Sequence, residues 1–258
     1  MELLFLDGRG EPLLLKQPHD ASKPAPIGDR FREWELYAAG ALDGLDAPEC
    51  VAASPAGAGP EPWLVLDRID GIPLWQADGL EPWQATARWL ARLHATPAPA
   101  VARLLRHDRA YLRSVTATAA ELAADVRAAV DRAITLVSAD PPVFLHGELY
   151  PSNVIVQATP SGSRIRPIDW ETAGTGPWAL DLAALIAGNW PRRRRAAIVD
   201  AYARERGLEP NQLEPALDAA RLLVAVQWLG WSWGADGPPP EHRHDWAADT
   251  DELAGRIR

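Results

Sequence analysis

A predicted β-hairpin between Val143 and Glu171 constrains the fold of this chain more than any other feature. Val154 to Val156 is a β-branched run typical of a strand. A Pro-Ser-Gly-Ser turn follows, and Arg164 to Ile168 then alternates polar and apolar residues as a returning strand does. An antiparallel hairpin brings its outer ends together, so we expect Asn153, just before the first strand, to lie close to Asp169, just after the second. Oxygen ligands gathered in this way suit Mg²⁺ that carries phosphate groups.

The segments around this hairpin resemble a known family. They read His146-Gly147-Glu148-Leu149-Tyr150-Pro151-Ser152-Asn153, then Ile168-Asp169-Trp170-Glu171, then Asp181-Leu182-Ala183. This ordered set is similar to the catalytic and metal-binding loops of the aminoglycoside phosphotransferase and choline kinase group, relatives of the protein kinases. Their pattern is H-G-D-x-x-x-x-N, I-D-W/F-E and D-L-A. The resemblance implies an α+β, protein-kinase-like fold with a small N-terminal sheet lobe and a larger, mainly helical C-terminal lobe.

The resemblance also implies roles for these residues. Asn153 and Asp169 would bind the metal ion. Glu171 is either a further ligand or the cap of the next turn. His146 would brace the catalytic loop through backbone contacts, and Asp181 would accept hydrogen bonds from backbone donors of that loop.

Glu148 departs from the family pattern, because it stands where the family has its catalytic aspartate. That group accepts the proton of the attacking hydroxyl, and general-base help of this kind contributes a factor of ~10²–10⁴ in rate. Glutamate keeps the carboxylate but extends its reach by about 1.5 Å, and a displacement near ~1 Å can cost on the order of 10²-fold. Either the acceptor lies slightly deeper, or the site is catalytically impaired.

A nucleotide site is implied in the N-terminal part. Lys16 follows three leucines at the end of a predicted strand and precedes a predicted helix that carries Glu33. The resemblance implies that Lys16 pairs with Glu33, or alternatively with Glu35, and reaches the nucleotide phosphates. The adenine would hydrogen-bond to backbone groups of Asp67-Arg68-Ile69.

Residues 1–70 read as this nucleotide-binding lobe, and residues 71–258 read as the catalytic and substrate-binding lobe. The elements expected in the first lobe are a hairpin of Leu3–Leu6 and Leu13–Lys16, a helix from about Asp29 to Leu42, a connection from Val51 to Pro62, and a strand at Trp63–Leu66. Only fifteen residues precede Lys16, and the hairpin uses most of them. We therefore expect the family's first strand and its Gly-rich phosphate-covering loop to be missing, with Gly8-Arg9-Gly10 serving as a tight turn.

Apolar residues recur at helical spacing through most of the second lobe. The helices expected there span about residues 83–94, 109–138, 178–187, 191–206, 212–233 and 246–257. Pro141-Pro142 bars any continuation of the second of these helices.

The formal net charge of −9 limits the classes of partner. It argues against nucleic acid, because phosphate binding needs a basic surface, and it is compatible with a cationic acceptor. Arg192 to Arg195 is read as a solvated helix face.

Acidic side chains near the C-terminus either attract an amine or form a solvated face: Asp236, Glu241, Asp245 and Asp249. Tryptophans in the same region either line a substrate cleft or belong to the core: Trp228, Trp231, Trp233 and Trp246.

Cysteine usage and hydropathy indicate the compartment. Cys50 is the single cysteine, so no intrachain disulfide forms, and we expect a reducing cytoplasm. The N-terminal segment is too short and too acidic to read as a signal peptide. We expect no membrane span, because a run of ~20 apolar residues is missing.

These observations predict an ATP- and Mg²⁺-dependent phosphotransferase that acts on a hydroxyl of a small molecule of the aminoglycoside, amino-alcohol or sugar type. The alternative is a pseudokinase of the same fold that binds a ligand or a partner. The choice between ATP and GTP, the acceptor and the oligomeric state stay open at this point.

Overall fold

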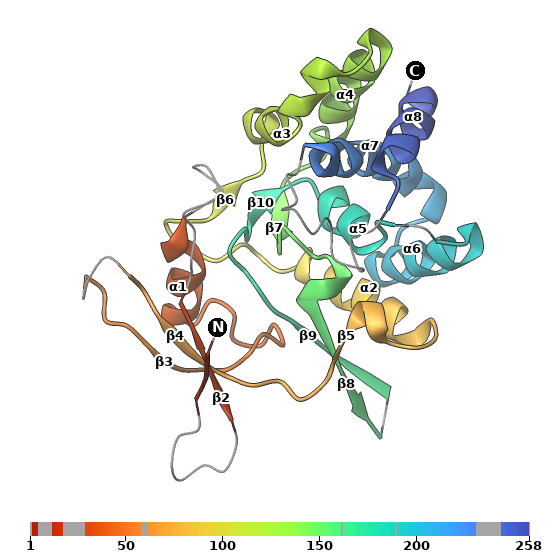
Figure 1. Cartoon of the computed structure of the whole chain (residues 1–258). Coiled ribbons are helices and arrows are strands. Elements are labelled where there is room, and N and C mark those ends of the chain that lie inside the picture. The colour runs from red at the N-terminus through yellow and green to blue at the C-terminus, as the bar shows by residue number, and fades with distance from the viewer. Residues whose placement is uncertain are drawn as a thin grey trace.

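An antiparallel four-stranded sheet and one helix form the N-terminal lobe (Figure 1). The computed structural model describes residues 2–4, 12–17, 29–57, 61–160, 162–188, 190–230 and 244–257. The lobe contains β1 (Glu2–Leu4), β2 (Leu13–Lys16), β3 (Cys50–Ala53), β4 (Leu64–Asp67) and α1 (Arg30–Ala38), with the strands in the order β1-β2-β4-β3. The predicted first hairpin is confirmed, because β1 pairs with β2 in antiparallel register. The predicted turn at Gly8-Arg9-Gly10 lies outside the described residues.

Two predictions for this lobe are wrong in detail. Strand β3 falls partly within the stretch that was predicted to be a connection, since an alanine-rich segment has little strand propensity of its own. It forms because it pairs with β4, with Cys50 opposite Leu66. Helix α1 ends at Ala38, short of Leu42, because Gly40 adopts φ +65°, a left-handed conformation that ends a helix.

The predicted central hairpin is confirmed. Strand β8 (Val154–Thr159) pairs with β9 (Gly162–Pro167), and Val154 lies opposite Pro167. The short strand β5 (Ile72–Pro73) extends this sheet on the other side of β8. The Ile168 N–H donates to the Asn153 carbonyl at 2.9 Å, which continues the pairing to the functional end of the hairpin.

A third small sheet places the loop that follows β7 (Val143–Leu145). Its strand order is β6-β10-β7, and β6 (Leu105–Arg106) and β10 (Gly174–Gly176) were not predicted. They are too short to leave a periodic signal. The sheet requires close backbone approach, because a Cβ on Gly174 would lie 2.1 Å from the Leu105 carbonyl oxygen.

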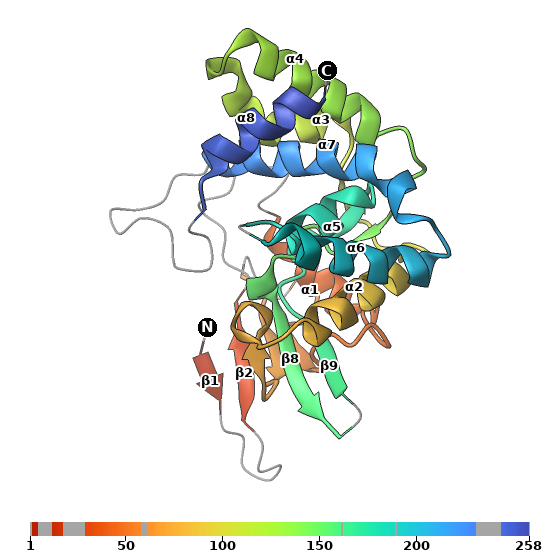
Figure 2. The same cartoon turned by 90° about the vertical axis from the view of Figure 1, so that its right-hand side faces the viewer.

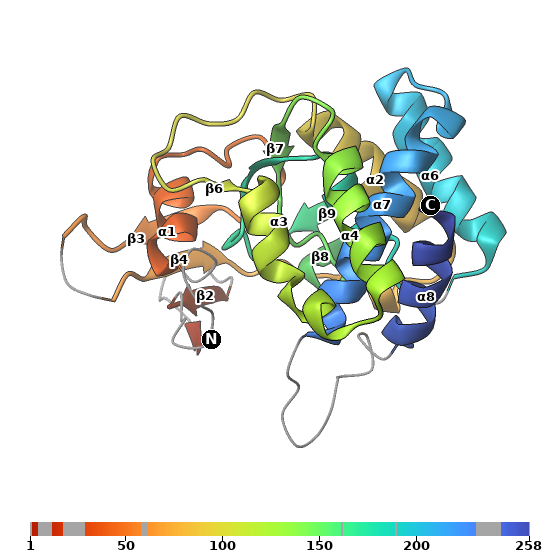
Figure 3. The same cartoon turned by 90° about the horizontal axis from the view of Figure 1, so that it is seen from above.

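Helices make up most of the C-terminal lobe, and the described residues contain eight α-helices in all. Those beyond α1 are α2 (Glu81–Leu93), α3 (Arg109–Val115), α4 (Ala124–Val137), α5 (Ala179–Leu185), α6 (Arg192–Arg206), α7 (Pro210–Leu229) and α8 (Trp246–Arg256). Helix α7 packs against α4, α5 and α8, and α2 packs against α6 (Figures 2 and 3). The fold is therefore the predicted α+β, two-lobed, kinase-like one. No helix within the described ranges combines the length and the apolar character needed to cross a bilayer.

The predicted long helix over residues 109–138 is wrong. The chain forms α3, a 3₁₀ segment (Ala117–Glu121) and then α4. Thr116 caps the break, with its Oγ1 donating to the Leu112 carbonyl at 2.7 Å. The 3₁₀ segment packs against α7, where Thr118 occupies the space that a side chain at residue 230 would need. Tertiary packing thus overrides a local sequence that is compatible with one continuous helix.

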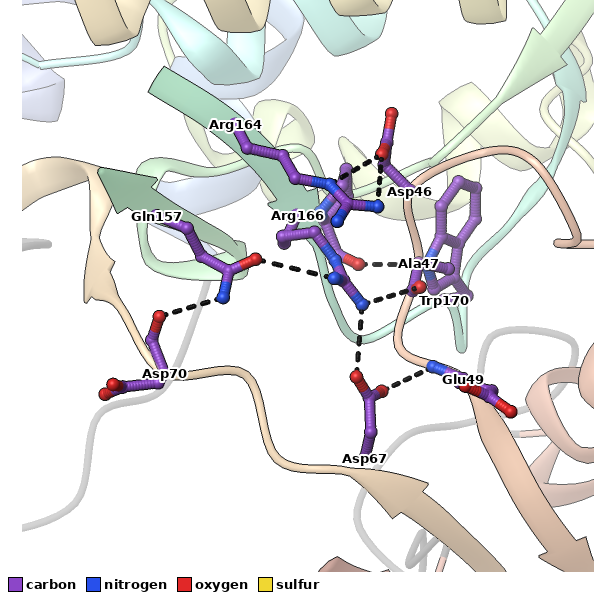
Figure 4. A network of polar contacts seen from close by, with 10 residues as sticks. Asp46, Ala47, Glu49, Asp67, Asp70, Gln157, Arg164, Arg166 and Trp170 are labelled. Atoms are coloured by element: carbon purple, nitrogen blue, oxygen red, sulfur yellow. Dashed lines mark hydrogen bonds and ion pairs between the residues drawn. The ribbon is translucent and has the colours of Figure 1, made fainter. Parts of the chain in front are cut away.

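A buried arginine joins the central hairpin to the N-terminal lobe (Figure 4). Arg166, on β9 and 8% exposed, donates to the Asp67 carboxylate at 3.3 Å and to the Ala47 carbonyl at 3.1 Å. The same Asp67 carboxylate accepts from the Glu49 N–H. Closer to the hairpin turn, Arg164 pairs with Asp46 at 3.1 Å. These contacts fix the end of β4 relative to the hairpin, and hence one lobe relative to the other.

Candidate active site

A cavity of about 410 Å³ lies between the N-terminal sheet, α1 and the end of the central hairpin. It is lined by Leu14, Lys16, Glu33, Tyr37, Pro48, Leu66, Asp67, Arg68, Ile69, Asn153, Ile155, Ile168 and Asp169. The charged and amide side chains of Lys16, Glu33, Asn153 and Asp169 belong to this set, and so do several aliphatic side chains. A flat apolar group fits between such aliphatic walls, and a charged group fits beside the polar side chains.

Lys16 is held between two carboxylates. Its Nζ lies 2.6 Å from a Glu33 carboxylate oxygen and 2.6 Å from Asp169 Oδ1. Burial alone would lower the pKa of Lys16, but the negative charges of Glu33 and Asp169 outweigh burial and raise it. The predicted pairing of Lys16 with Glu33 is therefore present. Glu35 lies elsewhere and accepts from the Arg103 N–H at 2.9 Å.

Glu33 is 1% exposed and is held in place by a second donor. The Trp170 N–H donates to its Oε1 at 3.1 Å. Burial raises the pKa of Glu33, the charge of Lys16 lowers it, and the net direction is upward. Because Trp170 follows Asp169 directly, this hydrogen bond ties helix α1 to the segment that carries Asp169.

The end of the hairpin offers two oxygen ligands in one place. Asp169 has φ +67°, a conformation that non-glycine residues rarely adopt and that is concentrated at functional sites. The side-chain Nδ2 of Asn153 donates to the Glu148 carbonyl at 3.0 Å, which leaves its Oδ1 as an acceptor. The described residues contain no cluster of three His, Cys, Asp or Glu side chains suited to a metal. Two hard oxygen ligands fit Mg²⁺, which usually completes its shell with water and substrate phosphates.

The loop that follows β7 is held by one buried carboxylate. Asp181, on α5, accepts from the His146 N–H at 2.8 Å and from the Gly147 N–H at 2.9 Å. His146 in turn contacts the Ile168 carbonyl through Nε2 at 3.0 Å. Gly147 has φ +92°, and a Cβ there would lie 2.2 Å from the Thr172 carbonyl oxygen, so this position requires glycine. His146 and Asp181 therefore make the backbone contacts that the sequence analysis predicted for them.

Two residues that the sequence analysis did not select extend this support. His94, which caps the C-terminal end of α2, lies 3.4 Å from Asp181 Oδ2 through Nε2 and 2.8 Å from the Tyr202 hydroxyl through Nδ1. Burial lowers the pKa of His94, although Asp181 opposes the shift. Burial would raise the pKa of Asp181, but His94, His146 and the backbone donors lower it overall. A histidine on an apolar helix face carries no sequence signal that identifies such a contact.

Glu148 and Glu171 lie near the cavity without lining it. Glu148 is partly exposed in the loop between His146 and Asn153. Burial raises the pKa of Tyr111 and of Tyr150, and the negative charge of Glu148 adds to both shifts. Two tyrosine hydroxyls therefore lie in the electrostatic range of Glu148. Glu171 accepts a hydrogen bond from Arg32 through its backbone carbonyl.

The other end of the cavity is the segment after β4. Asp67, Arg68 and Ile69, whose backbone is expected to contact the adenine, all line it. The Arg68 N–H is already used, because it donates to the Pro12 carbonyl at 3.3 Å. Within the described part of the chain no acceptor is found for the Ile69 N–H. The Asp67 carboxylate accepts a hydrogen bond from Arg166, so we expect Asp67 to contact a ligand through its backbone groups.

Two of the acidic residues near the C-terminus, Asp245 and Asp249, make local contacts. Asp245 caps α8 by accepting from the Ala248 N–H at 3.0 Å, and Asp249 pairs with His244 at 2.8 Å. The predictions for Asp236 and Glu241 lie outside the described residues. Trp228 and Trp246 stack with their ring centroids 5.6 Å apart, and both remain partly exposed.

Comparison with known proteins identifies relatives of this architecture. Residues 3–223 match the model of a family described as the phosphotransferase enzyme family. No curated protein sequence is detectably similar to this chain.

Several solved structures share the fold at low sequence identity. A choline/ethanolamine kinase family protein from Mesorhizobium loti is 19% identical with a TM-score of 0.63, over 100% of this chain and 87% of that one. A microcompartment-associated aminopropanol kinase is 18% identical with a TM-score of 0.59, over 99% of this chain and 89% of that one. The GDP complex of aminoglycoside 2'-phosphotransferase-IIIa is 16% identical with a TM-score of 0.57, over 86% and 80%. At these identities the likeness establishes the fold alone.

Proposed function

Because this chain belongs to the phosphotransferase enzyme family, we propose that it transfers the γ-phosphoryl group of ATP, with Mg²⁺, to a hydroxyl of a small molecule. One observation carries the proposal: Lys16, Asn153 and Asp169 line the same cavity, and the backbone after β4 forms its other end. Phosphoryl transfer needs little from a protein beyond charge neutralisation and in-line positioning of the reactants. This cavity offers a cation and two hard oxygen ligands, together with aliphatic side chains and the backbone after β4.

Each end of the cavity has a separate part in nucleotide binding. The adenine would lie between Leu14 and Ile155 and would accept a hydrogen bond from the Ile69 N–H. Lys16 would contact the phosphates while Glu33 keeps its side chain in place. Asn153 and Asp169 would hold Mg²⁺, which neutralises the phosphate oxygens when bound, with Glu171 as a further ligand.

Glu148 would act on the acceptor. The acceptor oxygen forms a bond to the γ-phosphorus while the bond from that phosphorus to the bridging oxygen breaks and ADP leaves. The hydroxyl proton passes to the Glu148 carboxylate. Asp181 keeps this carboxylate in position by holding the two backbone N–H groups just before it.

An amine-bearing alcohol is the acceptor class that we propose. Tyr150, two residues after Glu148, lies against Trp228 at a centroid distance of 5.1 Å, and Trp228 stacks on Trp246. A row of aromatic rings beside a carboxylate suits an ammonium group. The net charge of −9 and the neighbours named as aminopropanol, ethanolamine and choline kinases support the same class. The lone Cys50 fits a cytoplasmic enzyme.

Nucleotide binding can be tested by thermal shift. At about 100 times Kd a ligand adds ~2.7 kcal/mol to the unfolding free energy, which for a chain of this size corresponds to a rise in Tm of roughly 5–10 °C. We expect this shift with ATP and Mg²⁺, a smaller shift in Asp169→Asn, and none for Mg²⁺ alone. The absence of any shift with millimolar ATP or GTP would refute the proposal.

A pseudokinase is the second candidate, because Glu148 replaces the expected aspartate. Turnover distinguishes the phosphotransferase from the pseudokinase. It can be measured by an ADP-release assay with ethanolamine, choline, aminopropanol, aminoglycosides and sugars, followed by ³¹P NMR of the product. If Glu148 is the base, Glu148→Gln lowers kcat by about 10²–10⁴, while Glu148→Asp retains or raises activity. Nucleotide binding without turnover on any acceptor supports the pseudokinase, and equal turnover in Glu148→Gln shows that this carboxylate is not the base.

A further inference from the structure

A second cavity, of about 1010 Å³, lies between the start of α1, the segment around β6, and α3. We propose that it binds the oxyanion group, phosphate or carboxylate, of a small molecule. It shares no lining residue with the candidate nucleotide cavity. Four arginines line it, and this is unexpected in a chain with a net charge of −9: Arg30, Arg32, Arg103 and Arg106.

The walls of this cavity are held together by hydrogen bonds. Glu35, on α1, accepts from the Ala102 N–H at 3.3 Å and from the Arg103 N–H at 2.9 Å. Arg32 Nε donates to the Arg103 carbonyl at 2.8 Å. The Arg103 guanidinium lies over the Phe31 ring at 5.2 Å. The space is therefore built between two elements that are fixed to each other, and it does not depend on a single surface side chain.

The acidic groups in the lining are already engaged. Asp29 caps α1 by accepting from the Phe31 N–H and also pairs with Arg103 at 2.9 Å. Asp108 caps α3 by accepting from the N–H groups of Ala110 and Tyr111. The lining holds four arginines and two carboxylates, so positive charge is in excess, although Arg30 also pairs with Glu61 at 2.6 Å.

Arg106 is suited to contact an anion directly, and the buried Arg32 adds positive charge to the wall of the cavity. Arg32 is 2% exposed and donates to the backbone carbonyls of Arg103 and Glu171. Burial lowers the pKa of Arg32, which means that an added negative charge beside it would be favourable. Arg106 is exposed and has no hydrogen-bond or ion-pair partner for its side chain within the described ranges. The planar guanidinium fork matches the oxygens of phosphate and carboxylate.

The cavity borders the candidate active site. Tyr111 lines it and lies in the electrostatic range of Glu148. Arg32 contacts the carbonyl of Glu171, two residues after Asp169. An anion held in this cavity thus lies next to the segments that carry the base and the metal ligand, although its binding can be measured without turnover.

Inorganic phosphate and acetate serve as probes in thermal shift and calorimetry, with chloride at equal ionic strength as the reference. We expect phosphate to raise Tm above the chloride reference both without nucleotide and with saturating ATP and Mg²⁺, because the two cavities are separate. Arg106→Gln removes one charge-assisted contact and should raise Kd for phosphate about tenfold. Arg109→Gln, an exposed arginine on α3 outside the lining, is the matched control and should leave Kd unchanged.

The two variants separate the outcomes. A phosphate shift that is lost in Arg106→Gln and kept in Arg109→Gln supports the site, and the larger of the phosphate and acetate shifts identifies the preferred oxyanion. The proposal is overturned by a wild-type shift no greater than that of chloride, by an equal loss in both variants, or by displacement of phosphate on adding ATP. Failure of nucleotide binding alone would refute the proposed function and leave this inference standing.

Discussion

Asp181→Asn is the most informative single perturbation of this structure. The carboxylate is fully buried and accepts two backbone N–H groups, from His146 at 2.8 Å and from Gly147 at 2.9 Å. Its pKa is lowered although burial acts in the opposite direction, so its surroundings stabilise the charged form. Asparagine has almost the same shape but only one acceptor oxygen, and its NH₂ group would face the second N–H donor.

The magnitude follows from these contacts. One buried N–H loses its acceptor, at a cost of about 1–3 kcal/mol, and the remaining hydrogen bond changes from a charged to a neutral one, at about 1 kcal/mol. The expected loss of unfolding free energy is therefore about 2–4 kcal/mol, which corresponds to a fall in Tm of roughly 5–15 °C. Since the loop carries Glu148, a displacement of ~1 Å would also lower kcat by on the order of 10²-fold.

Urea denaturation followed by circular dichroism measures the first effect, and single-turnover kinetics measures the second. Asp131→Asn, at an exposed position on α4, is the matched control and should change the unfolding free energy by less than about 0.5 kcal/mol. If Asp181→Asn costs less than about 1 kcal/mol, the two backbone contacts do not hold the loop, and other groups must position Glu148.

Two further predictions concern pH and the contact between the lobes. Burial lowers the pKa of His94, His107 and His146, so the unfolded chain takes up protons below about pH 6.5 while the folded chain does not. The contribution to stability is then fully present above about pH 7.5 and falls as the pH is lowered through 6.5 to 5.5, by at most ~1.4 kcal/mol per histidine; a flat profile in urea denaturation would contradict this. Arg166→Met removes the buried contact to Asp67 and should lower the unfolding free energy by about 1–3 kcal/mol and weaken ATP binding. The exposed ion pair of Arg164 with Asp46 should contribute less than ~1 kcal/mol to the unfolding free energy, so Arg164→Met is the control. Equal effects of the two substitutions would show that burial of Arg166 is unimportant.

Several features of the fold and site could be predicted because they are encoded over a few neighbouring residues. Three β-branched residues, a turn and an alternating strand predict the hairpin, and the pairing of Val154 with Pro167 confirms it. Hairpin geometry then places Asn153 beside Asp169 without further information. The ion pair of Lys16 with Glu33 is different, because the family resemblance implied it, with Glu35 as the alternative, and only the structure shows that Glu33 is the partner.

Other features were decided only by tertiary contacts between segments far apart in the chain. The break between α3 and α4 forms where Thr118 packs against Gly230, and the support of Asp181 by His94 and Tyr202 joins three helices. The arginine-lined cavity likewise joins α1 to the segment around β6. Local sequence carries propensity and periodicity, which act over a few residues. Which buried polar groups find partners depends on the whole packed chain, and burial without a partner is costly enough to decide the structure at those points.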